Sequence, residues 1–150
     1  MATGKSEEQM TSVEIRYGDW ATLSADAQEI RIAVFVQEQN VPPELEMDEK
    51  DAVCLHAVAY DAAGVPVGTA RLLPDGHIGR MAVMKHARGA GIGSALLRGL
   101  MAHARERGHP DVLLSAQTHA APFYLAHGFA QVGGEFHEAG IPHIEMRHVF

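Results

Sequence analysis

The sequence predicts an α/β fold, an α+β mixed sheet in which antiparallel hairpins are followed by one parallel β-α-β unit. Short β-rich runs in the first half are joined by tight-turn residues, which is typical of antiparallel hairpins. Further on, a glycine-rich loop and a long amphipathic helix separate two apolar runs, which is typical of a parallel connection. A chain of 150 residues that is 47% apolar and 21% charged also suits one globular domain.

A single domain is expected over residues 13–150, after a polar leader at residues 1–12 that we expect to be disordered. The leader has no apolar stretch, so it does not resemble a signal peptide. The single cysteine, Cys54, excludes an internal disulfide framework. The longest uncharged run, residues 112–134, contains polar residues, proline and glycine, and is not a membrane span. We therefore expect a cytoplasmic protein without a membrane partner.

The first half is expected to contain a strand, a helix and three further strands. Alternating apolar residues predict a strand over residues 13–17. Ser24 is expected to cap a helix over residues 25–37, which has apolar residues along one side. The acidic stretch that ends at Asp51 is expected to be a loop with a short helical turn. Three further strands, joined by turns at 61–64 and 74–76, are expected at 53–60, 65–73 and 77–84.

The second half is expected to begin with the clearest helix of the chain. Ile92, Leu96 and Leu100 lie along one stripe of this helix, and Gly108 and Pro110 end it. The remaining elements are expected to be a strand at 112–116, a helix at 120–127, and strands at 129–136 and 143–149. The expected order is β-α-β-β-β-α-β-α-β-β, with the strands on either side of the glycine-rich helix paired in parallel.

The net charge of −7 combines two segments of opposite sign. The acidic segment runs from Glu38 to Asp51, with acids at Glu38, Glu44, Glu46, Asp48, Glu49 and Asp51. The basic segment holds Arg71, Arg80, Lys85, Arg88, Arg98, Arg105 and Arg107. Because a net acidic chain is a poor binder of polyanions, we expect no nucleic acid partner. The two segments favour two ligands of opposite charge.

The loop from Arg88 to Ser94 predicts a site for a phosphate or pyrophosphate. Its three alternating glycines leave backbone N–H groups uncovered, and the helix that follows adds partial positive charge at its N-terminus. Arg88 can add charge-assisted hydrogen bonds. Two common nucleotide motifs do not fit: a P-loop requires a lysine after Gly93, and a dinucleotide motif that starts at Gly89 requires glycine where Ser94 stands.

Two motifs carry a resemblance that covers nearly the whole chain. Arg88-x-x-Gly91-x-Gly93, after the expected strand at 77–84, resembles the acyl-CoA motif of the GNAT acetyltransferase superfamily, and Phe123–Phe129 resembles its second motif. The ElaA-like subgroup of small bacterial GNAT proteins is resembled by further residues, namely Phe35–Gln39, Glu46-x-Asp48-x-x-Asp51, His56 and Gly140–His143.

The resemblance implies an acetyl-CoA site. The pantetheine arm would bond to the backbone of Met81, Ala82 and Val83, like an added strand, where the strand at 77–84 splays from the strand at 112–116. Gln117 is a candidate contact to the same arm. The pyrophosphate would bind the loop, which consists of Arg88, Gly89, Ala90, Gly91, Ile92, Gly93 and Ser94.

The resemblance also implies direct acetyl transfer to an amine, without a covalent enzyme intermediate and without a metal. Tyr124 matches the tyrosine that faces the sulfur and acts as general acid, and a backbone N–H near Val83 would bind the oxyanion. The amine must lose a proton before it attacks. Glu38, Asp48 and His56 are candidate bases or acceptor contacts, and further candidates are Glu46, Asp51 and His119.

Other functions stay open at this stage. Arg31, Phe35 and the acidic motif also resemble acyl-homoserine lactone synthases, which share the fold. A non-catalytic CoA-binding regulatory module is a second alternative. The acceptor, a small-molecule or peptide amine, is not identified by the sequence, and a homodimer is one of the oligomeric states that the resemblance allows.

Overall fold

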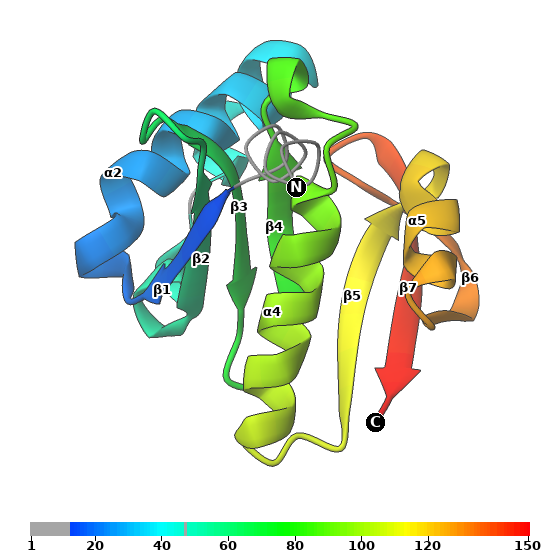
Figure 1. Cartoon of the computed structure of the whole chain (residues 1–150). Helices are drawn as coiled ribbons and strands as arrows, with labels where there is room; N and C mark the ends of the chain where they lie inside the picture. Colours follow the sequence, from blue (N-terminus) through cyan, green and yellow to red (C-terminus); the bar gives the residue numbers. More distant parts are fainter. Residues whose placement is uncertain (1–12, 47) are drawn as a thin grey trace, which may run out of the picture.

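Two adjoining sheets with helices on their faces make up the described part of the chain, residues 13–46 and 48–150 of this computed structural model (Figure 1). The predicted leader at residues 1–12 lies outside the described residues. The first sheet has the antiparallel order β1-β2-β3-β4, formed by Glu14–Gly18, Leu55–Tyr60, Pro66–Leu72 and Ile78–Val83. The second has the order β5-β7-β6, formed by Asp111–Gln117, Ile141–Val149 and Ala130–Glu138.

The helices are placed on the two faces of the first sheet and beside the second. The longer ones are α2 (Trp20–Arg31), which continues as the π-helical segment η1 (Ile32–Glu38), and α4 (Ile92–Glu106). The short ones are α3 (Pro43–Glu46), α5 (Ala121–Ala126) and the turns η2 (Glu49–Val53), η3 (Lys85–Ala87) and η4 (Thr118–Ala120). No helix among the described residues is long and apolar enough to cross a membrane.

The expected element order is confirmed, but the start of the first helix is corrected. Ser24 does not cap it, because the helix already begins at Trp20 and Ser24 lies within it. Asp19 is the N-cap, and its carboxylate accepts a hydrogen bond of 2.9 Å from the Thr22 N–H. The predicted helix over residues 25–37 is also not one regular α-helix, since its backbone changes to π-helical at Ile32.

The predicted parallel pair exists at one end only. A single parallel bridge joins His77 to Leu113, and the Leu113 N–H donates to the Gly76 carbonyl at 3.2 Å. Beyond that point β4 and β5 separate into different sheets and diverge toward their carboxyl ends (Figure 1). The sheet is therefore divided, and an opening forms between the ends of β4 and β5.

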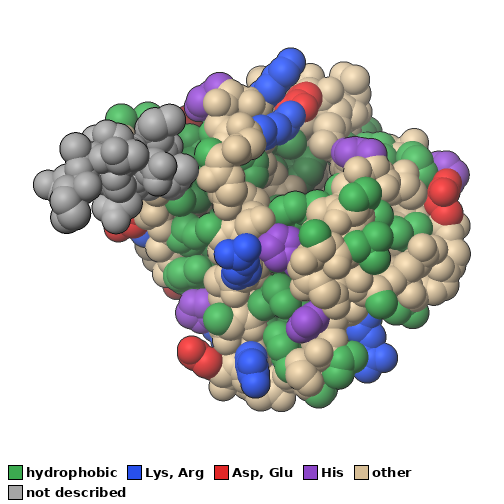
Figure 2. Space-filling model, turned by 45° about the vertical axis from the view of Figure 1, so that its right-hand side comes forward, with side chains coloured by type: hydrophobic (Ala, Val, Ile, Leu, Met, Phe, Trp, Pro, Cys, Tyr) green, Lys and Arg blue, Asp and Glu red, His purple; other side chains and the backbone are tan. Residues whose placement is uncertain are grey.

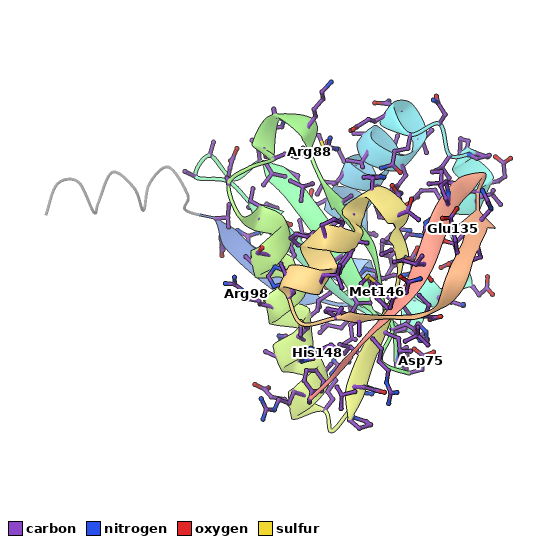
Figure 3. All side chains as sticks on the ribbon, turned by 90° about the vertical axis from the view of Figure 1, so that its right-hand side faces the viewer. Asp75, Arg88, Arg98, Glu135, Met146 and His148 are labelled. Atoms are coloured by element: carbon purple, nitrogen blue, oxygen red, sulfur yellow. The ribbon has the colours of Figure 1, made fainter. Side chains whose placement is uncertain are left out.

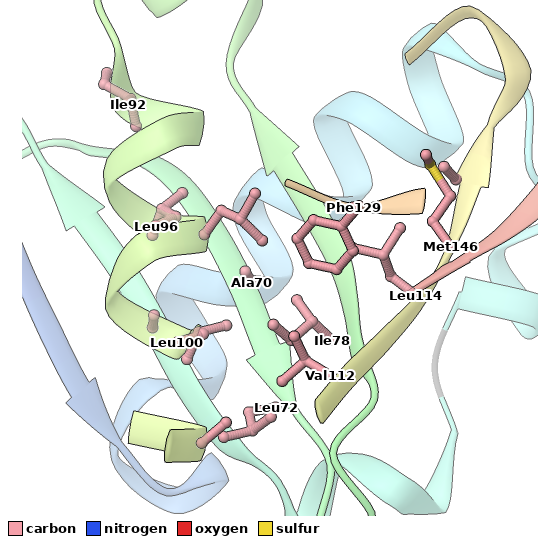
Figure 4. Packing of buried hydrophobic residues seen from close by; sticks show 14 of the residues in the cluster. Ala70, Leu72, Ile78, Ile92, Leu96, Leu100, Val112, Leu114, Phe129 and Met146 are labelled. Atoms are coloured by element: carbon pink, nitrogen blue, oxygen red, sulfur yellow. The ribbon is translucent and has the colours of Figure 1, made fainter. Parts of the chain in front are cut away.

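Helix α4 carries the core that spans both sheets. Leu96, Leu97 and Leu100 are fully buried there, in one cluster with β5 and β7 residues such as Met146 (Figure 4). Gly68 of β3 allows a close approach, because a Cβ at this position would lie 2.9 Å from Ile92 Cγ2 and 3.0 Å from Leu96 Cδ1. The start of α4 is thereby held against the end of β4. A second cluster packs α2 on the opposite face of the first sheet.

Leu100→Ala is expected to lower the free energy of unfolding by about 2–5 kcal/mol, because it removes a buried side chain from this core. Leu125→Ala is the matched control: Leu125 is 55% exposed, and its truncation should cost less than about 0.5 kcal/mol. Urea unfolding of both variants measures the difference. Equal effects would contradict the assignment of α4 to the central core.

Candidate active site

A cavity of about 340 Å³ lies at the carboxyl end of β4, beside the start of α4. Figure 2 shows a hollow on the face that carries α4 and α5, with basic, acidic and histidine side chains at its rim. The lining residues are Val83, Ala87, Arg88, Gly89, Gly91, Ile92, Gly93, Ser94 and Phe123. Six of the seven residues predicted to bind the pyrophosphate are thus brought together, and the seventh, Ala90, lies exposed between two of them.

The glycine loop leaves its backbone open to ligands. Gly89 and Gly91 have φ values of +85° and +81°, in the left-handed region that favours glycine. A Cβ at either position would meet nothing within 4 Å. Gly91 is also the N-cap of α4 and has no side chain to cap the first N–H groups of the helix. The loop therefore fits an anionic ligand such as a diphosphate.

Arg88 is paired within the protein. Its guanidinium donates two hydrogen bonds of 2.7 Å to the two carboxylate oxygens of Glu38, the last residue of η1. Its Nε also donates to the Val83 carbonyl at 3.0 Å. Both side chains are partly exposed, and the Arg88 contact holds the pKa of Glu38 below its usual value. In Figure 3, Arg88 lies at the loop that precedes α4.

The acidic segment is compensated by arginines from other elements. Asp48 and Asp51 both accept hydrogen bonds from Arg71 of β3, each at 2.7 Å. Arg31 of α2 donates to Glu46 and, at 2.9 Å, to Asp51. The Arg71 hydrogen bond is the main cause that lowers the pKa of Asp48 to about 2. These acids, which were predicted to face an acceptor, are therefore ionised partners of the protein's own arginines.

His56 lies behind this ionic cluster. Its side chain is buried, its Nε2 lies 2.8 Å from the Asp51 carbonyl oxygen, and its ring packs 4.8 Å from that of Trp20. Since that carbonyl can only accept, Nε2 carries the proton in this contact. Burial lowers the pKa of His56. The imidazole is therefore neutral at pH 7.

Tyr124 lies between α5 and the exposed edge of β4. Its Oη is 3.7 Å from the Met81 Sδ, and its ring packs edge-on against Phe123 and Phe129. Burial raises the pKa of the phenol to about 12. Tyr124 thus keeps its proton at neutral pH and can donate it toward the β4 edge.

Sequence reasoning missed residues that reach across the opening. Gln117 at the end of β5 donates 2.9 Å to the Oε1 of Gln39, which follows Glu38. Glu38 and Gln39 together therefore contact both walls of the opening. On α4, the Ser94 Oγ lies 2.9 Å from His127 Nε2. The motif Phe35–Gln39 was a signal for Gln39, whereas no local signal marked His127. Among the described residues, no group of His, Cys, Asp and Glu is arranged to hold a metal ion.

Comparison with known proteins identifies the class. An acetyltransferase (GNAT) domain model matches residues 22–150, so the chain belongs to the GNAT acetyltransferase family and is an acyltransferase. It is 42% identical to the uncharacterized N-acetyltransferase YjcF of Bacillus subtilis over 125 residues, which cover 81% of this chain and 89% of that protein.

Solved structures agree with this class. Escherichia coli ElaA is similar, with a TM-score of 0.80 and 30% identity over 90% of this chain and 99% of that one. An acyl-CoA N-acyltransferase from Pseudomonas aeruginosa has a TM-score of 0.81 and 32% identity over 92% of this chain and all of that chain (100%). The expected fold and the ElaA-like character are thereby confirmed.

Glu38→Gln is expected to tighten CoA binding, because it frees Arg88 and removes a negative charge beside the glycine loop. An exposed ion pair is worth about 0.2–1 kcal/mol, so the Kd should fall by up to about fivefold. Isothermal titration with CoA measures the change, and Glu44→Gln, an exposed acid of α3, is the control. Weaker binding by the Glu38 variant would contradict competition between Glu38 and the phosphates for Arg88.

Asp48→Asn is expected to flatten the dependence of stability on pH. A carboxyl whose folded pKa is about 2 stabilises the folded state above its usual pKa and loses this effect as the pH falls toward 2. Between pH 6 and pH 3 (roughly the range in which unfolded aspartates titrate), urea midpoints of the wild type should fall more steeply than those of the variant. Parallel curves would refute the Asp48 ion pair.

Proposed function

We propose that this protein is a cytoplasmic enzyme that transfers the acetyl group of acetyl-CoA to a primary amine of a small molecule or peptide. The observation that carries the proposal is the cavity formed by the glycine loop at the point where β4 and β5 diverge. A backbone lined with open N–H groups suits the diphosphate, and an unpaired strand edge suits an extended arm with amide groups. Membership of the GNAT family supports acetyl-CoA as the donor.

Each part of acetyl-CoA has a proposed contact. The diphosphate would bind the N–H groups from Gly89 to Ser94 and the guanidinium of Arg88, once Glu38 gives way. Hydrogen bonds to charged oxygens contribute about 1.5–3 kcal/mol each, so a few of them decide the affinity. The pantetheine arm would extend along Met81, Ala82 and Val83 and reach Gln117 across the opening.

The proposed chemistry is a direct transfer. The amine nitrogen forms a bond to the thioester carbonyl carbon, and a backbone N–H near Val83 stabilises the oxyanion. The C–S bond then breaks, and the sulfur takes the electron pair and the proton of Tyr124. The nitrogen gives up a proton that restores the phenol. Since the amine arrives as an ammonium, one proton in total goes to solvent. The raised pKa of Tyr124 supports the donor role.

The proton acceptor for the ammonium is proposed from the exposure of the three candidates. The side chain of Glu38 is 35% exposed, whereas Asp48 is held by two arginines and His56 is buried. These facts support Glu38 as the contact to the incoming amine, either directly or through water. Asp48 and His56 are proposed to shape the wall behind it.

Two alternatives are kept as outcomes of the experiment below. Turnover with acyl-carrier substrates but not with acetyl-CoA would indicate chemistry like that of acyl-homoserine lactone synthases. CoA binding without turnover on any amine would indicate a regulatory module. The homodimer and the absence of nucleic acid and membrane partners stay predictions.

Tyr124→Phe is expected to lower kcat by about 10²-fold, as for the loss of a general acid, with little change in the KM for acetyl-CoA. A panel of primary amines, with release of CoA thiol as the readout, measures this effect. Tyr17→Phe is the matched control, because Tyr17 packs against α4 at Gly99, away from the cavity lining. Unchanged kcat in Tyr124→Phe would contradict the donor role.

A further inference from the structure

Strand β4 contains one extra residue just before the proposed acetyl-CoA edge. The pairing of β3 with β4 passes from Thr69–Ala82 to Arg71–Gly79, so Arg80 and Met81 together lie opposite Ala70. Two residues opposite one define a β-bulge. Arg80 has a φ of +48°, in the left-handed region that long side chains rarely adopt.

The bulge decides which side chains of β4 face the opening. Ile78, Met81 and Val83 pack against the cluster under α4, whereas Ala82 belongs to the cluster under α2. In a regular strand, residues 78 and 81 would face opposite sides of the sheet. The extra residue therefore turns Met81 toward Tyr124 and sets the orientation of the backbone groups from Met81 to Val83.

The Arg80 side chain is clamped by the segment that follows η1. Its Nε donates to the Glu46 carbonyl at 3.1 Å, and its Nη2 lies 3.3 Å from both the Leu45 carbonyl oxygen and Asp48 Oδ2. That segment is itself held in place, since Arg71 binds Asp48 and Arg31 binds Glu46. The bulge is thus tied through one side chain to a rigid ionic cluster.

A bulge alone would not require arginine. Glycine adopts positive φ values without steric cost and is the usual residue at such bulges. An arginine here adds conformational strain, which its side-chain bonds must offset. The side chain, and not the turn, therefore explains the residue.

We propose that Arg80 is a positioning residue for acetyl transfer. By anchoring the bulge to Leu45, Glu46 and Asp48, it holds Met81–Val83 in the register that the acetyl-CoA arm and the oxyanion require. This inference rests on the proposed function. It gives the acidic segment a different task from the one that the sequence indicated: it fixes the strand that holds the donor.

Arg80→Gly tests this inference, because glycine relieves the backbone strain and removes the clamp. The variant should unfold in urea close to the wild type, whereas kcat should fall by about 10²-fold, the loss expected from a misplacement of about 1 Å. The KM for acetyl-CoA should rise as well. Arg147→Gln, which removes an exposed ion pair with Asp111 at the other edge of the molecule, is the control and should keep wild-type kinetics.

Arg80→Lys covers the case in which the glycine variant fails to fold. Lysine keeps the charge near Asp48 but cannot reproduce the fork that reaches two carbonyls and a carboxylate. It should retain wild-type stability and show a smaller loss of kcat in the same direction. Wild-type kcat and KM in a folded Arg80→Gly or in Arg80→Lys would overturn the inference. A wild-type protein that neither binds CoA nor turns over would instead overturn the proposed function.

Discussion

The buried ion pairs between Arg31, Arg71 and Arg80 and the acids Glu46, Asp48 and Asp51 are the interactions on which the site depends. They join α2, β3 and β4 to the segment between η1 and β2, elements that are far apart in the sequence. Burying an ion costs several kcal/mol unless a partner compensates it, and removal of one partner costs about 3–5 kcal/mol. The segment can therefore occupy only the position in which its acids meet these arginines.

This position has consequences at both walls of the opening. On one side the clamp on Arg80 fixes the bulge of β4. On the other, the segment brings η1 to the glycine loop and to β5, through Glu38 to Arg88 and Gln39 to Gln117. The donor strand, the phosphate loop and the candidate acceptor wall are thus connected by a few side-chain contacts. Binding of a diphosphate at Arg88 would act directly on Glu38, the residue we propose for the amine.

The parts of the site that are local in the sequence could be predicted. The glycine loop combines a strand end, positive-φ glycines and a helix start within a few residues, and the aromatic motif around Tyr124 lies within one short helix. The contacts between distant residues could not be predicted. The charge run at 38–51 indicated a surface for a cation, because the sequence alone does not show that Arg31, Arg71 and Arg80 lie beside it. The division of the sheet and the bulge at Arg80 depend on packing of α4 and on these contacts, and neither has a local signal.

Backbone amide chemical shifts during a titration with CoA test the central claim, that acetyl-CoA binds between β4 and the glycine loop. The account predicts that the amides of residues 81–83 and 89–94 shift together with a single affinity. Glu38 and Gln39 should shift with the same affinity, because the phosphates compete for Arg88. Shifts confined to other surfaces, or saturation without change in these residues, would contradict the account.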